Sequence, residues 1–210
     1  QGFPNFEGPQ ELKDVLINEI RSGWNQYIVS YGLLELRETL AQHYENRYKL
    51  NYNVETEITI TQGATEALFN TLTGVFNDGD EVVVFEPFYD AYIPDLAMAG
   101  AKAVPITLSL NEDIRAEQLT NVLTKKTKGV IVNTPHNPTG KIFSKVELEI
   151  IADFAKKNNL TVISDEVYEH IVFDGNTHIS IAELDGMQER TIVISSLGKT
   201  FSFTGWKVGW

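Results

Sequence analysis

The sequence predicts an α/β fold, with an open, mostly parallel, doubly wound sheet and helices on both of its faces. Three observations support this prediction. Short β-branched runs alternate with amphipathic stretches, most of these runs are continuously apolar, and polar residues follow directly after them. A continuously apolar strand is typical of a sheet covered on both faces, because both sides of the strand are then buried.

We expect the strands and helices to alternate along the chain. The expected strands are Ile58–Thr61, Glu81–Phe85, Ala103–Thr107, Gly129–Asn133, Thr161–Ser164 and Thr191–Ser195. Helices are expected over Leu33–Tyr48, Glu66–Phe76 and Ala116–Thr124, and after residue 144. This last helix has the clearest start, because Ser144 and Glu147 form a capping box, and we expect it to end at Asn158-Asn159.

Composition excludes several classes of function. The 210 residues carry a formal net charge of −12, which argues against nucleic acid or an anionic membrane as partner, since both need a cationic face. The absence of cysteine rules out disulfides and thiolate metal sites. There is no apolar run of roughly 20 residues that could cross a bilayer, and Gln1–Pro4 does not begin a signal peptide. A cytoplasmic location is therefore expected.

Polar residues gather at one edge of the predicted sheet. In open α/β sheets, ligands bind outside the carboxyl ends of the strands. The segments that follow five of the expected strands are Gly63–Thr65, Glu86–Tyr89, Thr134–Gly140, Asp165–Tyr168 and Ser196–Lys199. We therefore expect a single site at this edge.

Lys199 and Asp165 are the principal candidate residues. Lys199 follows a strand within a turn of small residues, where a lysine is placed for Schiff-base chemistry, although most lysines are simply solvated. Asp165 directly ends a buried-type strand, where a carboxylate is costly unless a cation or donors meet it. The alternative for Asp165 is a helix N-cap for Glu166–His170.

Two loops add further candidates. The segment Asn133–Gly140 contains two X-Pro bonds and a glycine, which make a rigid turn that can hold the side chain of Asn137 in place. Gly63-Ala64-Thr65-Glu66 ends a strand and opens a helix, whose free backbone N–H groups can bind an anion. Thr65 as a simple N-cap is compatible with that interpretation.

Other motifs fail on inspection. The first expected strand is not followed by a dinucleotide-binding G-x-G-x-x-G turn. Ser196–Thr200 resembles half of a P-loop, but Val193 stands where the motif needs glycine. Glu166–His170 differs by one residue from a zinc-binding helix motif, with glutamate in place of a histidine ligand, and we interpret it as a polar helix start. No metal site is expected.

Taken together, these motifs resemble the fold type I pyridoxal-phosphate enzymes, specifically the class I/II aminotransferases of the kynurenine/glutamine/methionine group. The resemblance implies an N-terminal segment, residues 1–32, at the substrate entrance and dimer contact. It also implies a pyridoxal-phosphate-binding large domain, residues 33–210. The chain is expected to be a fragment that lacks the C-terminal small domain. The segments that carry the resemblance are Gln1–Phe6, Asn25–Tyr27, Glu86–Tyr92, Asn133–Gly140, Ser164–His170 and Ser196–Trp210.

The resemblance implies pyridoxal 5′-phosphate as cofactor, with Lys199, Asp165 and Tyr168 as catalytic residues. Lys199 would form the Schiff base and move the substrate proton. Asp165 would pair with the pyridinium nitrogen and keep it protonated. Asn137 and the Tyr168 hydroxyl would bind the phenolic oxygen of the cofactor, and Tyr89 would stack on its ring.

The resemblance also implies which groups bind the phosphate of the cofactor. The backbone amides of Ala64 and Thr65, the Ser196 hydroxyl and Lys207 would bind it. Lys207 stands where most of the wider class has arginine, so the bidentate fork is lost.

The N-terminal segment is expected to act at the subunit boundary. Tyr27 would reach the phosphate of the neighbouring subunit, which implies a homodimer with shared active sites. Gly2 and Phe3 would line the substrate entrance, and Asn137 would also contact substrate. The arginine that binds the substrate carboxylate in this family lies in the small domain.

The expected activity is transfer of the amino group of an aromatic or sulfur-containing amino acid to a 2-oxo acid. One alternative is a carbon–sulfur β-lyase on the same scaffold. Another is a non-catalytic pyridoxal-phosphate-binding module of a regulator.

Overall fold

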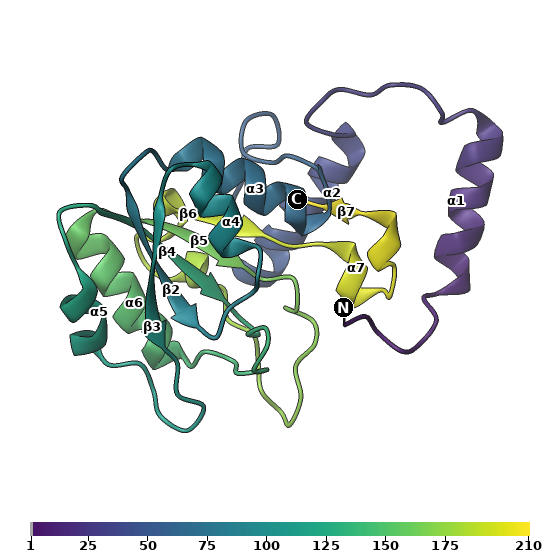
Figure 1. The fold of residues 1–210 in the computed structure, drawn as a ribbon. Helices are drawn as coiled ribbons and strands as arrows, with labels where there is room; N and C mark the ends of the chain where they lie inside the picture. The colour runs from purple at the N-terminus through teal and green to yellow at the C-terminus, as the bar shows by residue number, and fades with distance from the viewer. Residues whose placement is uncertain (1) are drawn as a thin grey trace.

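The computed structural model describes residues 2–210, so Gln1, the first residue of the expected N-terminal segment, lies outside the described residues. Its centre is a five-stranded, wholly parallel sheet with the strand order β3-β2-β4-β5-β6 (Figure 1). Strand β3 lies on one side of β2, and β4, β5 and β6 are added in turn on the other side, so the topological switch point lies between β2 and β4. The predicted doubly wound class is confirmed. The strands are β2 (Glu81–Glu86), β3 (Lys102–Thr107), β4 (Thr127–Asn133), β5 (Thr161–Asp165) and β6 (Thr191–Ile194).

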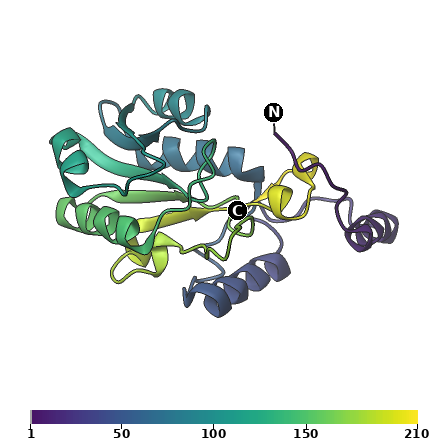
Figure 2. The same cartoon turned by 90° about the horizontal axis from the view of Figure 1, so that it is seen from below.

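Helices cover both faces of this sheet (Figure 2). Side chains of β2 alternate between two buried clusters: Val82 and Val84 belong to one, and Val83 belongs to the other. The first cluster contains apolar residues of α3 (Gly63–Val75) and α4 (Tyr92–Met98). The second contains apolar residues of α5 (Ala116–Val122) and α6 (Lys145–Asn158). Burial on both faces explains why the strands are continuously apolar.

The capping box predicted for α6 is present. Glu147 N donates to Ser144 Oγ over 3.2 Å, and Ser144 N donates to a Glu147 carboxylate oxygen over 2.9 Å. The helix ends at Asn159, which adopts the left-handed conformation at φ 51°. Both ends of this helix are therefore where the sequence places them.

The expectation for the first strand was wrong. Its β-branched run suggested a strand of the main sheet, but β1 covers only Thr61–Gln62 and pairs antiparallel with β7 (Val208–Gly209). Strand β7 also meets the end of β6, because Ser196 and Gly209 form an antiparallel bridge. A side chain at Gly209 would lie 2.4 Å from the Gly63 carbonyl carbon, so the close approach of β7 to the start of α3 requires glycine.

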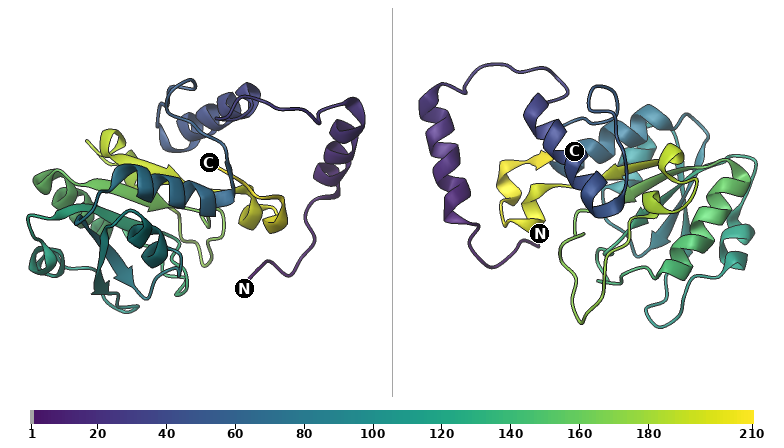
Figure 3. Two further views of the ribbon diagram at one scale, coloured as in Figure 1. Left: turned by 45° about the horizontal axis from the view of Figure 1, so that its top comes forward. Right: turned by 180° about the vertical axis from the view of Figure 1, so that it is seen from behind.

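The N-terminal third contains α1 (Gln10–Ser22) and α2 (Leu34–Tyr48). Helix α2 packs on the body of the molecule through Tyr44 and Tyr48, whereas none of the residues of α1 is buried within the described chain. Figure 3 shows α1 standing apart from the sheet, joined to it only by extended segments. Within residues 2–210, no helix is long and apolar enough to cross a membrane.

Short elements complete the chain. Two 3₁₀ turns, Ile181–Glu183 and Gln188–Arg190, precede β6. After β6 come α7 (Leu197–Thr200), a single helical turn that contains Lys199, and a third 3₁₀ turn, Thr204–Trp206.

Candidate active site

The carboxyl ends of β4 and β5 form the centre of the site. Asn133 and Asp165 are partners in the parallel register, so their side chains start from adjacent strand ends. Asn133 Nδ2 donates to the Asp165 carbonyl oxygen over 2.9 Å, and Asn133 Oδ1 accepts from Asn137 N over 2.7 Å. The strand end therefore holds the loop that carries Asn137 at a fixed distance from Asp165.

Asp165 is a buried carboxylate, with 3% of its surface exposed. Tyr92 donates its hydroxyl to Asp165 Oδ2 over 2.7 Å, and Val167 N lies 3.4 Å from Oδ1. Burial raises the pKa of Asp165 to about 6, although these two donors lower it. The helix-cap alternative was wrong, because residues 167–170 form a turn and not a helix. This carboxylate would gain stability from a cation placed beside it.

Lys199 lies near the ring of Tyr168, in the short helix α7 that follows β6. Its Nζ lies 5.7 Å from the centroid of the Tyr168 ring and donates to the Gly2 carbonyl over 2.9 Å. Burial lowers the pKa of Lys199, and the charge of Lys207 lowers it further. The pKa of Tyr168 is raised by burial, then by Asp165 and Tyr89. Tyr168 is therefore close enough to both the amine and the acid to link them.

An anion-binding corner lies at the start of α3. The helix begins at Gly63 after Gln62, so Thr65 is its third residue and not its N-cap. A Cβ placed on Gly63 would lie 3.5 Å from Lys207 Nζ and 3.3 Å from Lys207 Cε. The Lys207 side chain thus lies against the free N–H groups of the first helical turn, where both favour an anion.

Ser196 reaches this corner through β7. Its backbone bridges to Gly209, and a Cβ on Gly209 would lie 2.6 Å from Ala64 N. The structure therefore brings together the residues predicted to bind phosphate, although they come from α3, from the end of β6 and from β7. These residues are Ala64, Thr65, Ser196 and Lys207.

A cavity of about 380 Å³ opens beside the central residues, and Asn137 and Tyr168 both line it. A larger cavity of about 490 Å³ lies between α2 and β6, and no predicted site residue lines it. Neither cavity is lined by Lys199, Asp165 or Lys207, so we assign the functional site from the strand-end contacts and not from a cavity.

Two N-terminal candidates do not join the site within this chain. The Tyr27 side chain is fully exposed, and Phe3 is 74% exposed. Gly2 does approach, through its hydrogen bond from Lys199. Tyr89 lies in the site, with its ring centroid 5.7 Å from that of Tyr92 in an edge-on arrangement.

Two functional side chains were missed by reasoning from the sequence. Tyr92 is buried and supplies the hydroxyl that meets Asp165, and Asn133 fixes both Asp165 and Asn137. Both residues lie inside motifs that had already been singled out. The position of Asn133 as the last residue of a buried strand was a usable signal, but nothing local to Tyr92 indicated its partner.

Comparison with known proteins decides the family. The family model for aminotransferase class I and II matches residues 2–210. The chain belongs to this family. Within the aminotransferases, it is 46% identical to a kynurenine–oxoglutarate transaminase of Dictyostelium discoideum over 100% of its own length and 53% of that protein. It is 44% identical to a probable N-succinyldiaminopimelate aminotransferase of Mycobacterium tuberculosis over 100% of its length and 54% of that protein.

Solved aminotransferase structures share the fold. The N-succinyldiaminopimelate aminotransferase of Mycobacterium tuberculosis superposes with a TM-score of 0.96 at 44% identity, over 100% of this chain and 56% of that one. An Escherichia coli protein with a methionine aminotransferase function superposes with a TM-score of 0.95 at 38% identity, over 100% of this chain and 55% of that one. The chain thus spans about half the length of the aminotransferases it matches.

Proposed function

We propose that this chain is the cofactor-binding part of a pyridoxal-phosphate-dependent amino-acid aminotransferase. The observation that carries the proposal is that a buried acid, Asp165, and a partly buried amine, Lys199, both lie near Tyr168 at the carboxyl ends of the strands. In this proposal, residues 33–210 form the large domain. Residues 1–32 form the entrance and the dimer contact.

The residues present fit pyridoxal 5′-phosphate. Asp165 is a buried carboxylate that would be stabilised by a protonated ring nitrogen, and the corner formed by α3 and Lys207 suits a dianionic phosphate. Lys199 lies between Tyr168 and Gly2, within reach of a ring placed there. When bound, the cofactor supplies an electron sink that stabilises negative charge on the substrate Cα.

Each side chain has a separate task in this proposal. Lys199, whose lowered pKa favours the neutral amine, holds the cofactor and then carries the proton that leaves the substrate Cα. Asp165 stays ionised beside the ring nitrogen and keeps a proton there. The Tyr168 hydroxyl and the Asn137 amide bind the phenolic oxygen, and Tyr89 packs against the ring.

The phosphate anchors the cofactor at the other end. The first N–H groups of α3, at Ala64 and Thr65, donate to it together with the Ser196 hydroxyl, and Lys207 provides the opposing charge. A chain with a net charge of −12 needs this local compensation, because its overall field repels anions.

The proposed substrates are an aromatic or sulfur-containing amino acid and a 2-oxo acid. A kynurenine–oxoglutarate transaminase and a methionine aminotransferase among the similar proteins support this choice. Gly2, Phe3 and Asn137 would line the entrance. We also propose a homodimer in which Tyr27, which is fully exposed here, reaches the phosphate of the neighbouring subunit.

An amino-donor assay on the full-length protein tests the function. Kynurenine, methionine and glutamine would each be incubated with a 2-oxo acid, and the new amino acid and new 2-oxo acid quantified. We expect turnover that depends on the acceptor and is lost in Lys199→Ala. Pyruvate and ammonia released from a cysteine conjugate without an acceptor would instead support the β-lyase. Cofactor binding without any turnover would support the regulatory module.

A further inference from the structure

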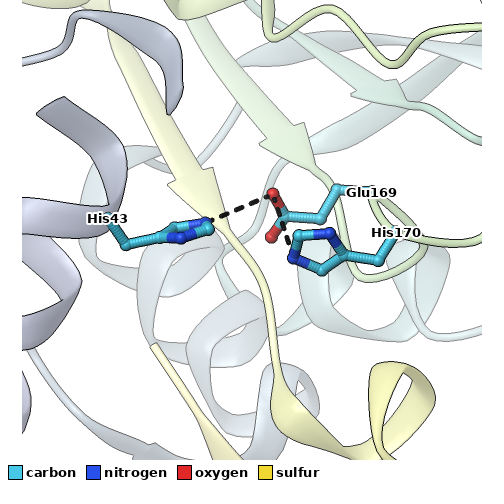
Figure 4. A group of neighbouring side chains, drawn as sticks. All are labelled: His43, Glu169 and His170. Atoms are coloured by element: carbon cyan, nitrogen blue, oxygen red, sulfur yellow. Dashed lines mark ion pairs between the residues drawn. The ribbon is translucent and has the colours of Figure 1, made fainter. Parts of the chain in front are cut away.

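Two histidines and a glutamate meet outside the proposed active site (Figure 4). His43 comes from α2, and Glu169 and His170 come from the turn that follows β5. Glu169 Oε2 lies 3.9 Å from His43 Nε2 and 3.9 Å from His170 Nε2. One ligand atom from each of the three residues lies within 4.8 Å of the others. The two imidazoles lie next to each other, with ring centroids 5.8 Å apart, and both approach the same carboxylate.

We propose that His43, Glu169 and His170 bind a divalent transition-metal ion, and that zinc is the ion they fit. Two imidazole nitrogens and one carboxylate oxygen form a donor set that zinc accepts in proteins, with a fourth position left for water. Tetrahedral ligands of zinc lie about 3.4 Å apart. The two 3.9 Å separations from Glu169 would contract by about half an ångström and the separation of the two imidazole nitrogens, at most 4.8 Å, by up to about 1.4 Å, which rotation of the imidazoles can supply.

Access to the cluster suits an ion that enters from solvent. The side chains of His43 and His170 are 34% and 32% exposed, whereas that of Glu169 is 2% exposed. The carboxylate therefore forms the floor of the site and the imidazoles form its open rim. The nearby pair of His178 and Glu166 is not open to an ion in this way, because both side chains are 0% exposed and contact each other directly over 2.8 Å.

Further contacts orient the carboxylate. Tyr48 donates its hydroxyl to Glu169 Oε2 over 2.5 Å, and Ser195 donates to Oε1 over 2.9 Å. Hydrogen bonds to a ligating carboxylate are a regular feature of metal sites.

The proposed ion has a structural consequence. It would join α2 to the turn that contains Tyr168, the neighbour of Glu169 in sequence. Such a link would restrict motion of that turn, since ligand positions become fixed relative to one another. The motif at residues 166–170 lacked a second imidazole in the sequence, and the fold supplies one from His43. This inference goes beyond the proposed function and does not depend on it.

Zinc titration of the full-length protein tests the site. The protein would be stripped with a chelator, and zinc binding measured by competition with a chromogenic chelator for wild type, His43→Gln, His170→Gln and the double variant. We expect wild type to bind one more equivalent than the double variant, and each single variant to bind that equivalent at least tenfold more weakly. Glu45→Gln, an exposed glutamate of α2 two residues from His43, is the matched control and should bind like wild type.

Two further readouts keep the test decisive if a variant folds poorly. Unfolding would be followed with and without zinc, and we expect zinc to raise the melting temperature of wild type but not of His170→Gln, whose side chain lies at the surface. Cobalt(II) should give intense visible bands in wild type only. The proposal is overturned if wild type binds no zinc, or if the double variant binds as much as wild type with equal affinity.

Discussion

The edge of the sheet at the carboxyl ends of its strands and the N-terminal segment, residues 2–32, contribute to the proposed site in different ways. At the edge, Asn133 and Asp165 are buried and joined to neighbours by hydrogen bonds within the chain. In the N-terminal segment, no residue of α1 is buried within the described chain, and the Tyr27 side chain is fully exposed. The comparison teaches that the acid end of the site is built by the core of the chain alone, whereas the proposed role of Tyr27 requires a second surface.

The largest expected effect lies at the edge. Asp165→Asn removes the charge that would keep the ring nitrogen protonated, so we expect kcat/KM to fall by about 10³-fold. Steady-state kinetics of the full-length protein measure this. Asp185→Asn, an exposed aspartate away from the site, is the control and should keep wild-type kinetics. Equal activity of the two variants would remove Asp165 from the mechanism.

The same substitution should stabilise the protein when the cofactor is absent. The pKa of Asp165 is raised from 3.8 to about 6, so the folded state holds a proton that the unfolded state has released, and stability falls as pH rises through that window. Asp165→Asn avoids the buried charge. Its free energy of unfolding should exceed that of wild type by about 3 kcal/mol near pH 8, with the gain shrinking toward pH 4.

Denaturant unfolding of the cofactor-free proteins at several pH values measures this difference. A gain that stayed constant with pH would show that the carboxylate is not buried as described. A free energy of unfolding below that of wild type at every pH would also contradict the buried, charged carboxylate.

A smaller effect is expected at Tyr92. Tyr92→Phe removes the hydroxyl that meets Asp165, so the pKa of Asp165 should rise further. We expect about a tenfold fall in kcat/KM and an upward shift of the acidic limb of its pH profile. Tyr52→Phe is the control, because its hydroxyl is buried without a hydrogen-bond partner among the described residues. An unshifted profile in Tyr92→Phe would contradict the coupling.

The smallest effect tests the N-terminal segment. Tyr27→Phe keeps the ring and removes one hydroxyl, so the affinity for pyridoxal 5′-phosphate should fall about fivefold, as for the loss of one hydrogen bond of about 1 kcal/mol. Equilibrium dialysis of the cofactor measures it. Tyr31→Phe, in the same segment, should bind as wild type does. If both variants lost affinity equally, the contribution would belong to the segment as a whole and not to Tyr27.

Most of the sheet could be predicted from the sequence. Strands β2, β4 and β5 are apolar runs buried along most of their length, whereas the edge strands β3 and β6 are partly exposed, and all five lie within two residues of their predicted bounds. Helix α6 was equally clear, because its capping box and left-handed Asn159 are local signals. The run at residues 58–61 misled the prediction, since β-branched residues show that a segment is extended but not which strand it pairs with.

Helices α1, α4 and the single-turn α7 were not predicted. In α4, Pro94 lies in the first turn, where an absent N–H costs nothing, yet proline usually signals the end of a helix. In α1, Val15, Leu16, Ile17 and Ile20 are exposed in this chain, so no packing partner indicates where the helix should lie.

Some features of the site could be predicted from the sequence and others could not. Asp165 and Lys199 could be named from the strand ends that carry them. The hydrogen bond between Tyr92 and Asp165 could not, because it joins residues 73 positions apart and depends on how α4 docks on the sheet.

The central claim is that Lys199 holds the cofactor while Asp165 pairs with its ring nitrogen. Borohydride reduction of the full-length protein loaded with pyridoxal 5′-phosphate, followed by peptide mass mapping, tests it most directly. We predict that the reduced cofactor is attached to the peptide containing Lys199 and that no peptide is labelled in Lys199→Ala. Attachment at Lys207 or another lysine, or undiminished labelling of the variant, would contradict the account.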